Sequence, residues 1–102
     1  MREYTIKIKI SSDLIEDIIS SAFGSAGITY WCDEVDGIQV KRNDRTYYRI
    51  HDAEAERWVN LTEDKIVKGL ELCYDKVDLT NLDGPQCDMI VQYALFGEQL
   101  YA

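Results

Sequence analysis

The sequence predicts one α+β domain, with a three- to five-stranded antiparallel sheet and three helices packed mainly on one face. Three observations support this class: apolar residues recur at helical spacing in three segments, β-branched and aromatic residues cluster in others, and turn residues separate those clusters. The predicted order is β-α-β-β-β-(β)-α-α. The length of 102 residues suits a single domain over residues 1–102.

The first two elements are a strand and a helix. Apolar and polar residues alternate over 4–10, which is typical of a strand with one buried and one wet face. Asp13 is the expected cap of the following helix, with Glu16 three residues on, as in a capping box. Gly24 and Gly27 are expected to end this helix.

The middle of the chain is expected to form hairpins. Residues 28–35 read as one strand, and Asp36-Gly37 predicts a tight turn into a return strand that begins at Ile38. Asn43-Asp44 predicts another turn. Further strands are expected at 46–51 and 57–61.

Adjacent aromatic residues lie within two of these strands. Neighbours in a strand point to opposite faces, so only one of Tyr30 and Trp31 can face the core, and the same holds for Tyr47 and Tyr48. The outward rings would form a partner or ligand surface, or would lie beneath a helix or a second subunit.

Two helices complete the chain. Thr62 is the expected cap of the first, whose buried stripe runs from Ile66 to Tyr74 and Val77. Asp83 is the expected cap of the second, with proline in its first turn. Met89, Tyr93 and Phe96 lie off the main stripe of this helix, which indicates either a central core position or an oligomer contact.

The charge balance limits the partners. Nineteen acidic residues against eleven basic residues give a net charge of −8, which repels nucleic-acid phosphates and favours basic surfaces. We therefore expect no direct binding of duplex nucleic acid.

The cysteines indicate reduced thiols and no zinc. Cys32, Cys73 and Cys87 are an odd number without short paired spacings, which fits neither a disulfide scaffold nor a structural zinc site.

No segment approaches the roughly 20 apolar residues of a membrane span. We expect a cytoplasmic protein without metal or cofactor and without membrane association.

No residue pattern indicates catalysis. His51 is the only histidine, and no serine or cysteine nucleophile lies in a recognisable motif with it. We expect no catalytic residues and no enzymatic activity.

A basic stretch leaves a nucleotide site open. Five of the eleven basic residues fall between Lys41 and Arg57, either as scattered surface charge or as an anion site. In a nucleotide site, Tyr30 or Trp31 would stack on a base and arginines would hold phosphate. The candidate residues for binding a ligand or partner are Tyr30, Trp31, Arg42, Arg45, Arg49, Gln92 and Tyr101.

Several stretches resemble a known group of proteins. Gly27-Ile28-Thr29-Tyr30-Trp31, the Leu61-Thr62 helix start with Gly69-Leu70, and the residues from Asp88 to Tyr101 are similar to those of small uncharacterised phage and prophage proteins. No motif of this group has an assigned chemistry. The resemblance implies an accessory protein acting in an infected bacterial cell.

The expected function is binding. The first hypothesis is a non-catalytic counter-defence protein that inhibits a host immune effector with a basic surface, such as a CRISPR effector. One alternative is a homo-oligomeric sponge that sequesters a nucleotide immune signal. Another is a structural or regulatory homo-oligomer.

Overall fold

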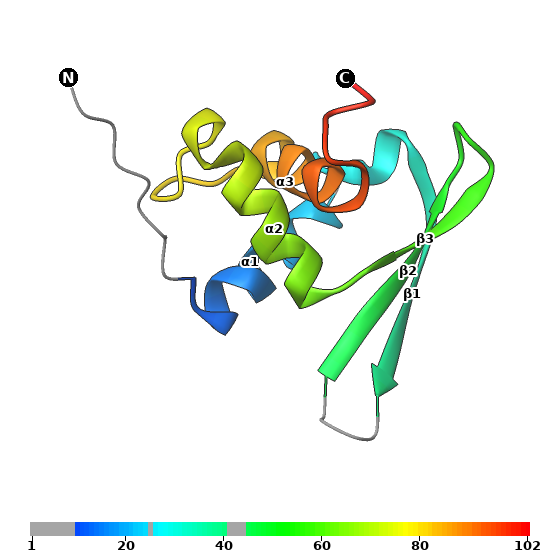
Figure 1. Cartoon of the computed structure of the whole chain (residues 1–102). Coiled ribbons are helices and arrows are strands. Elements are labelled where there is room, and N and C mark those ends of the chain that lie inside the picture. Colours follow the sequence, from blue (N-terminus) through cyan, green and yellow to red (C-terminus); the bar gives the residue numbers. More distant parts are fainter. Residues whose placement is uncertain (1–9, 25, 41–44) are drawn as a thin grey trace.

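The computed structural model describes residues 10–24, 26–40 and 45–102 (Figure 1). The fold is α+β, with three α-helices and one three-stranded antiparallel sheet of order β1-β2-β3 among these residues. In chain order the elements are α1 (Ser12–Ala22), the 3-10 helix η1 (Ile28–Tyr30), β1 (Cys32–Val40), β2 (Arg45–Asp52), β3 (Arg57–Leu61), α2 (Glu63–Cys73), the 3-10 helix η2 (Tyr74–Lys76) and α3 (Gly84–Phe96). The strand predicted at 4–10, except Ile10, and the turn predicted at Asn43-Asp44 lie outside the described residues.

Side-chain caps start the three α-helices. Thr62 accepts a hydrogen bond from the backbone N–H of Lys65, and Asp83 accepts one from Gln86, which confirms both predicted caps. The prediction for α1 was wrong: Ser11, not Asp13, is the cap, and its hydroxyl accepts from the N–H of Leu14. Ser11 has the extended backbone that a cap requires, whereas Asp13 already lies in the first helical turn.

The hairpin predicted at Asp36-Gly37 was wrong. Both residues lie inside β1, where Asp36 pairs with Arg49 and Gly37 pairs with Tyr48. Residues 32–35 of the first predicted strand and the segment from Ile38 are therefore parts of one strand. The intrinsic turn preference of Asp-Gly is outweighed by a ladder that continues on both sides of it.

The strand predicted at 28–35 was also wrong at its beginning. Residues Ile28–Tyr30 form η1, and the backbone N–H of Trp31 donates to Ile28 O at 3.0 Å. β1 begins only at Cys32, so the alternation expected of strand neighbours does not apply to Tyr30 and Trp31. It does apply to Tyr48, which packs edge-on against Phe23 at 5.0 Å, and to Tyr47 on the other face.

One face of the sheet contributes to the core. On this face Val35 pairs with Ile50, and Ile50 pairs with Val59, while Tyr48 pairs with Leu61. Figure 1 shows the three α-helices gathered together, with the β1–β2 ribbon extending away from them. The buried apolar residues are Ile15, Ile18, Ile19, Ala22, Ile28, Trp31, Cys32, Ile50, Leu61, Ile66, Leu70, Cys73, Cys87, Ile90 and Val91.

Two predictions about helix faces had different outcomes. Cys73 and Cys87 are buried free thiols, as their positions on the apolar stripes predicted. Tyr74, predicted to lie on the same buried stripe as Cys73, is exposed. The reason is that α2 ends at Cys73 and the tighter 3-10 turn η2 changes the direction of the next side chain.

Candidate functional site

A buried carboxylate on α3 organises the first candidate site. Asp88 is only 3% exposed. Its Oδ1 accepts hydrogen bonds from Trp31 Nε1 at 2.8 Å and from Gln92 Nε2 at 2.9 Å, and its Oδ2 accepts from the Tyr30 hydroxyl at 2.6 Å. Three donors therefore satisfy a charge that would otherwise be costly to bury.

Gln92 connects this network to residue 101. Its Nε2 donates to Tyr101 O at 3.0 Å, and its Oε1 accepts from the Tyr101 backbone N–H at 2.8 Å. The Tyr101 hydroxyl donates to Asp52 Oδ2 at 2.7 Å. Four candidate residues from the sequence, Tyr30, Trp31, Gln92 and Tyr101, thus lie in one cluster although they come from both halves of the chain.

The hydrogen bonds of this cluster contribute to pKa shifts at Tyr30 and Asp52. Burial, and then the hydrogen bond and charge of Asp88, raise the pKa of Tyr30 to about 12, so this hydroxyl remains a donor near neutral pH. Burial alone would raise the pKa of Asp52, but hydrogen bonds from Tyr101, Ala55, Glu54 and Arg57 outweigh it and hold the pKa below its ordinary value. Both shifts maintain the protonation states that the hydrogen bonds require.

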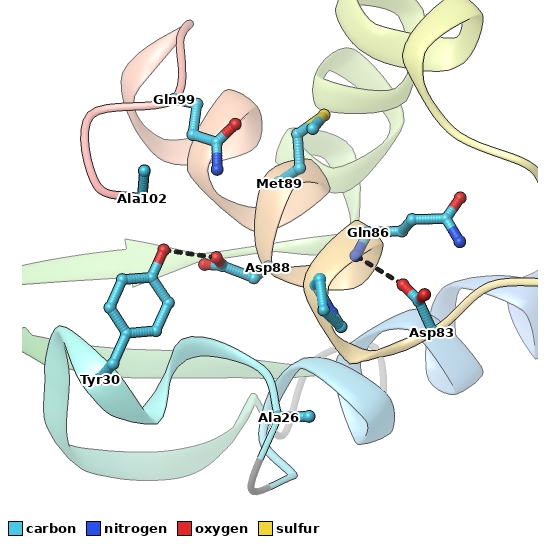
Figure 2. A pocket seen from close by; sticks show the side chains of 9 residues that line it. Ala26, Tyr30, Asp83, Gln86, Asp88, Met89, Gln99 and Ala102 are labelled. Carbon is cyan, nitrogen blue, oxygen red and sulfur yellow. Dashed lines mark hydrogen bonds between the residues drawn. The ribbon is translucent and has the colours of Figure 1, made fainter.

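A pocket of about 480 Å³ opens beside this cluster. Figure 2 shows the Tyr30 hydroxyl directed at Asp88 on one side of the pocket, with Met89 and Gln99 nearby. The described lining residues include the carboxylates of Asp83 and Asp88 but no lysine or arginine. This pocket therefore offers a phosphate group no cation.

The two residues proposed to stack on a base, Tyr30 and Trp31, differ in exposure. Trp31 is 1% exposed, and its ring packs against Phe96 at 5.8 Å and Tyr101 at 5.4 Å, so the rings of this chain occupy its surroundings. Tyr30, at 49% exposed, is the accessible member of the pair. Arg42 and the Arg45 side chain lie outside the described residues.

The residues proposed for an oligomer contact have different surroundings. Phe96 packs within the chain against Trp31 and Tyr101, and the guanidinium of Arg57 lies 4.8 Å from its ring centroid. Tyr93 is partly buried against the core. Met89 is partly exposed and lines the pocket.

The second candidate site is the other face of the sheet, here named the open face: Ile38, Tyr47, Arg49, His51 and Trp58. Trp58 lies on the edge strand β3 and is 41% exposed. The Arg49 guanidinium lies 4.8 Å from the Trp58 ring centroid, and the His51 ring centroid lies 5.0 Å from it. His51 Nδ1 and Asp33 Oδ1 are 2.6 Å apart.

Acidic residues surround the open face. Glu34 and Asp36 lie on β1, and Glu54 and Glu56 lie in the turn between β2 and β3, and all four are exposed. Trp58 did not enter the sequence-based candidates. The inward positions of Val59 and Leu61 in the predicted strand 57–61 implied that Trp58 points outward, and that signal was available.

The described thiols and carboxylates do not form an evident reactive centre. Burial raises the pKa of Cys73 and of Cys87 to about 11, and burial raises that of Cys32, which disfavours the nucleophilic thiolate. Across residues 10–24, 26–40 and 45–102, no group of three or more potential ligands could hold a metal ion. None of the described helices has the length and apolar character needed to cross a membrane.

Comparisons of this chain with protein-family models, with curated proteins and with solved structures found no match.

Proposed function

We propose that this protein is a non-catalytic binding protein of the phage accessory type, and that it inhibits a host immune effector by docking on a basic surface. The open face carries this proposal, because it combines an exposed tryptophan with a surrounding set of carboxylates. Tryptophan, tyrosine and arginine are the residues that most often dominate protein interfaces.

The arrangement around Trp58 supports an anchoring role. Its ring is contacted by Arg49 and His51, and His51 is in turn held by Asp33. An anchor that is already ordered before binding loses less side-chain entropy when the complex forms. The strand beneath it is paired along its length with β2, which supplies a rigid base.

Charge supports a basic partner. The net charge is −8, and Glu34, Asp36, Glu54 and Glu56 lie around the anchor. Such a surface attracts a nucleic-acid-binding channel over long distances and repels the nucleic acid itself. Occupying that channel would inhibit the effector without chemistry on either protein.

The test uses a matched pair of exposed aromatic residues. The wild type, Trp58→Ala and Tyr74→Ala are expressed in bacteria that carry defined immune systems, beginning with CRISPR effectors, and phage plaquing is counted. Tyr74 is the control because it is similarly exposed but lies on η2. We expect the wild type and Tyr74→Ala to restore plaquing against at least one system, and Trp58→Ala to lose this effect.

Calorimetry with the purified effector then measures the interaction. Loss of an anchor at the centre of an interface costs about 2 kcal/mol or more, so Trp58→Ala should weaken affinity by about 30-fold. Affinity should also fall as salt rises. The proposal would be contradicted if the wild type restored plaquing against none of the systems. Equal plaquing with Trp58→Ala and Tyr74→Ala would also contradict it.

A further inference from the structure

Residues 97–102, here named the strap, are held to the rest of the chain mainly through one residue, Tyr101. Gly97 ends α3 with a φ of +74°, and Glu98, Gln99 and Leu100 are exposed, Leu100 at 46%. Tyr101 alone among strap residues packs against the core. The strap therefore consists of Gly97, which ends the helix, a short exposed connector and Tyr101, here named the anchor.

The anchor is held at its backbone, its ring and its hydroxyl. The residues that hold it, here together named the groove, are Tyr30, Trp31, Asp52, Gln92 and Phe96. Gln92 pairs with both backbone polar groups of Tyr101, much as a neighbouring strand would, and the Tyr30 hydroxyl oxygen, whose hydrogen is donated to Asp88, lies 2.9 Å from Tyr101 O. The Tyr101 ring lies 5.4 Å from that of Trp31 and 6.1 Å from that of Phe96.

The third part is the phenol itself. Its hydroxyl donates to the buried Asp52, whose other oxygen accepts the backbone N–H groups of Glu54 and Ala55. A phenylalanine at this position would leave Asp52 without that donor. The groove thus selects a tyrosine together with its two backbone polar groups.

We propose that this groove is a binding site for a tyrosine-bearing segment, and that the strap of a second copy of this chain can replace the resident strap. Strap exchange breaks and remakes the same contacts, so its cost is confined to the connector and to association. The buried amide oxygen of Gln92 and the carboxylate of Asp52 favour occupancy, because an emptied groove would leave them short of donors.

The connector also limits the geometry of exchange. The four Cα–Cα steps from Gly97 to Tyr101 span at most about 14 Å when extended. Two exchanging copies must therefore bring the ends of their α3 helices close together. The proposal does not depend on the open face or on the function proposed above.

The first test measures binding of the segment in trans. The full chain carrying Tyr101→Ala is mixed with a fluorescent peptide of residues 97–102, and polarisation is recorded. We expect saturable binding, weaker binding of a peptide with phenylalanine in place of the tyrosine, and none with alanine there. Circular dichroism checks that the variant is folded, and full-chain Tyr101→Phe replaces it if it is not.

The second test asks whether a second copy is the occupant. Full-chain Tyr101→Ala has a groove without an anchor, and full-chain Gln92→Ala has an anchor with a damaged groove. Sedimentation should show each alone as a monomer and an equimolar mixture as a complex. Absence of peptide binding at about 1 mM would overturn the site. Peptide binding without complex formation would overturn the exchange between copies.

Discussion

Asp88 is the residue on which the polar network depends. Tyr30, Trp31 and Gln92 all donate to its carboxylate, which needs no lysine or arginine within the described residues because hydrogen bonds replace a counter-ion. The network joins η1, α3 and the strap. The polar groups of these residues are therefore already hydrogen-bonded to one another in the absence of any ligand.

Asp88→Asn should destabilise the protein. An asparagine accepts through one oxygen only and carries no charge, so Tyr30, Trp31 and Gln92 lose their hydrogen bonds to an ionised acceptor, at a cost of about 1–3 kcal/mol. Urea unfolding measures the loss. The control is Asp75→Asn, an exposed residue 3.9 Å from Lys76, which should change stability by less than about 0.5 kcal/mol. Equal effects of the two substitutions would contradict the role of Asp88.

At the scale of the elements, α2 packs closely against α3 at Gly69. A Cβ built on Gly69 would lie 2.7 Å from the backbone nitrogen of Ala94 and 2.8 Å from the carbonyl oxygen of Ile90. Only a residue without a side chain permits this separation between the helices. The glycine is required by backbone proximity, not by its own dihedral angles.

Gly69→Ala should therefore lower the melting temperature, although alanine favours helix formation by about 1 kcal/mol. Separating two packed helices costs about 1–3 kcal/mol, which outweighs that gain. Thermal unfolding followed by circular dichroism tests this. In Gly37→Ala the new methyl would meet the Tyr48 ring at 3.5 Å, an ordinary contact, so that variant should unfold near the wild-type temperature.

At the scale of the whole molecule, the strap joins the end of α3 to the sheet through Tyr101 and Asp52. Because the pKa of Asp52 is held below its ordinary value, this carboxylate contributes stability above the pKa of the unfolded chain. That contribution is lost as the pH falls through the lower, folded-state pKa. Acid should therefore weaken this connection.

Tyr101→Phe should lower stability near neutral pH and make stability less dependent on acid. The change removes one of the hydrogen bonds that lower the pKa of Asp52, so the folded-state pKa moves back towards the unfolded value. About 1.5–3 kcal/mol should be lost near neutral pH, and this difference from the wild type should shrink as the pH falls. Chemical unfolding measured from pH 7 down to pH 3 follows both effects. Tyr74→Phe is the control, and an unchanged acid profile in Tyr101→Phe would disprove the link.

The elements most accurately predicted are those with local causes. Thr62 and Asp83 cap their helices through hydrogen bonds to residues three positions away, and the apolar stripes of these helices repeat within a few turns. Asp36-Gly37 shows the limit of such reasoning. Its turn preference is local, but pairing with Arg49 and Tyr48 extends the strand through it.

The candidate site was predicted as residues but not as an arrangement. Tyr30, Trp31, Gln92 and Tyr101 were selected in advance, yet the reason given for the first two, opposite faces of a strand, was wrong. Their positions follow from hydrogen bonds to Asp88 across 57 and 58 residues of sequence. Periodicity contains no information about such distant partners.

Composition and local pattern were sufficient for the α+β class, the acidic charge, two of the three helix caps and the strands at 46–51 and 57–61. Folding decided that Trp31 is buried, that Trp58 is exposed beside Arg49 and His51, and that Tyr101 returns to the core. The physical reason is the separation along the sequence between the residues that interact. Caps and amphipathic stripes arise from neighbours within a few residues, whereas buried polar networks form only when distant segments exclude water together.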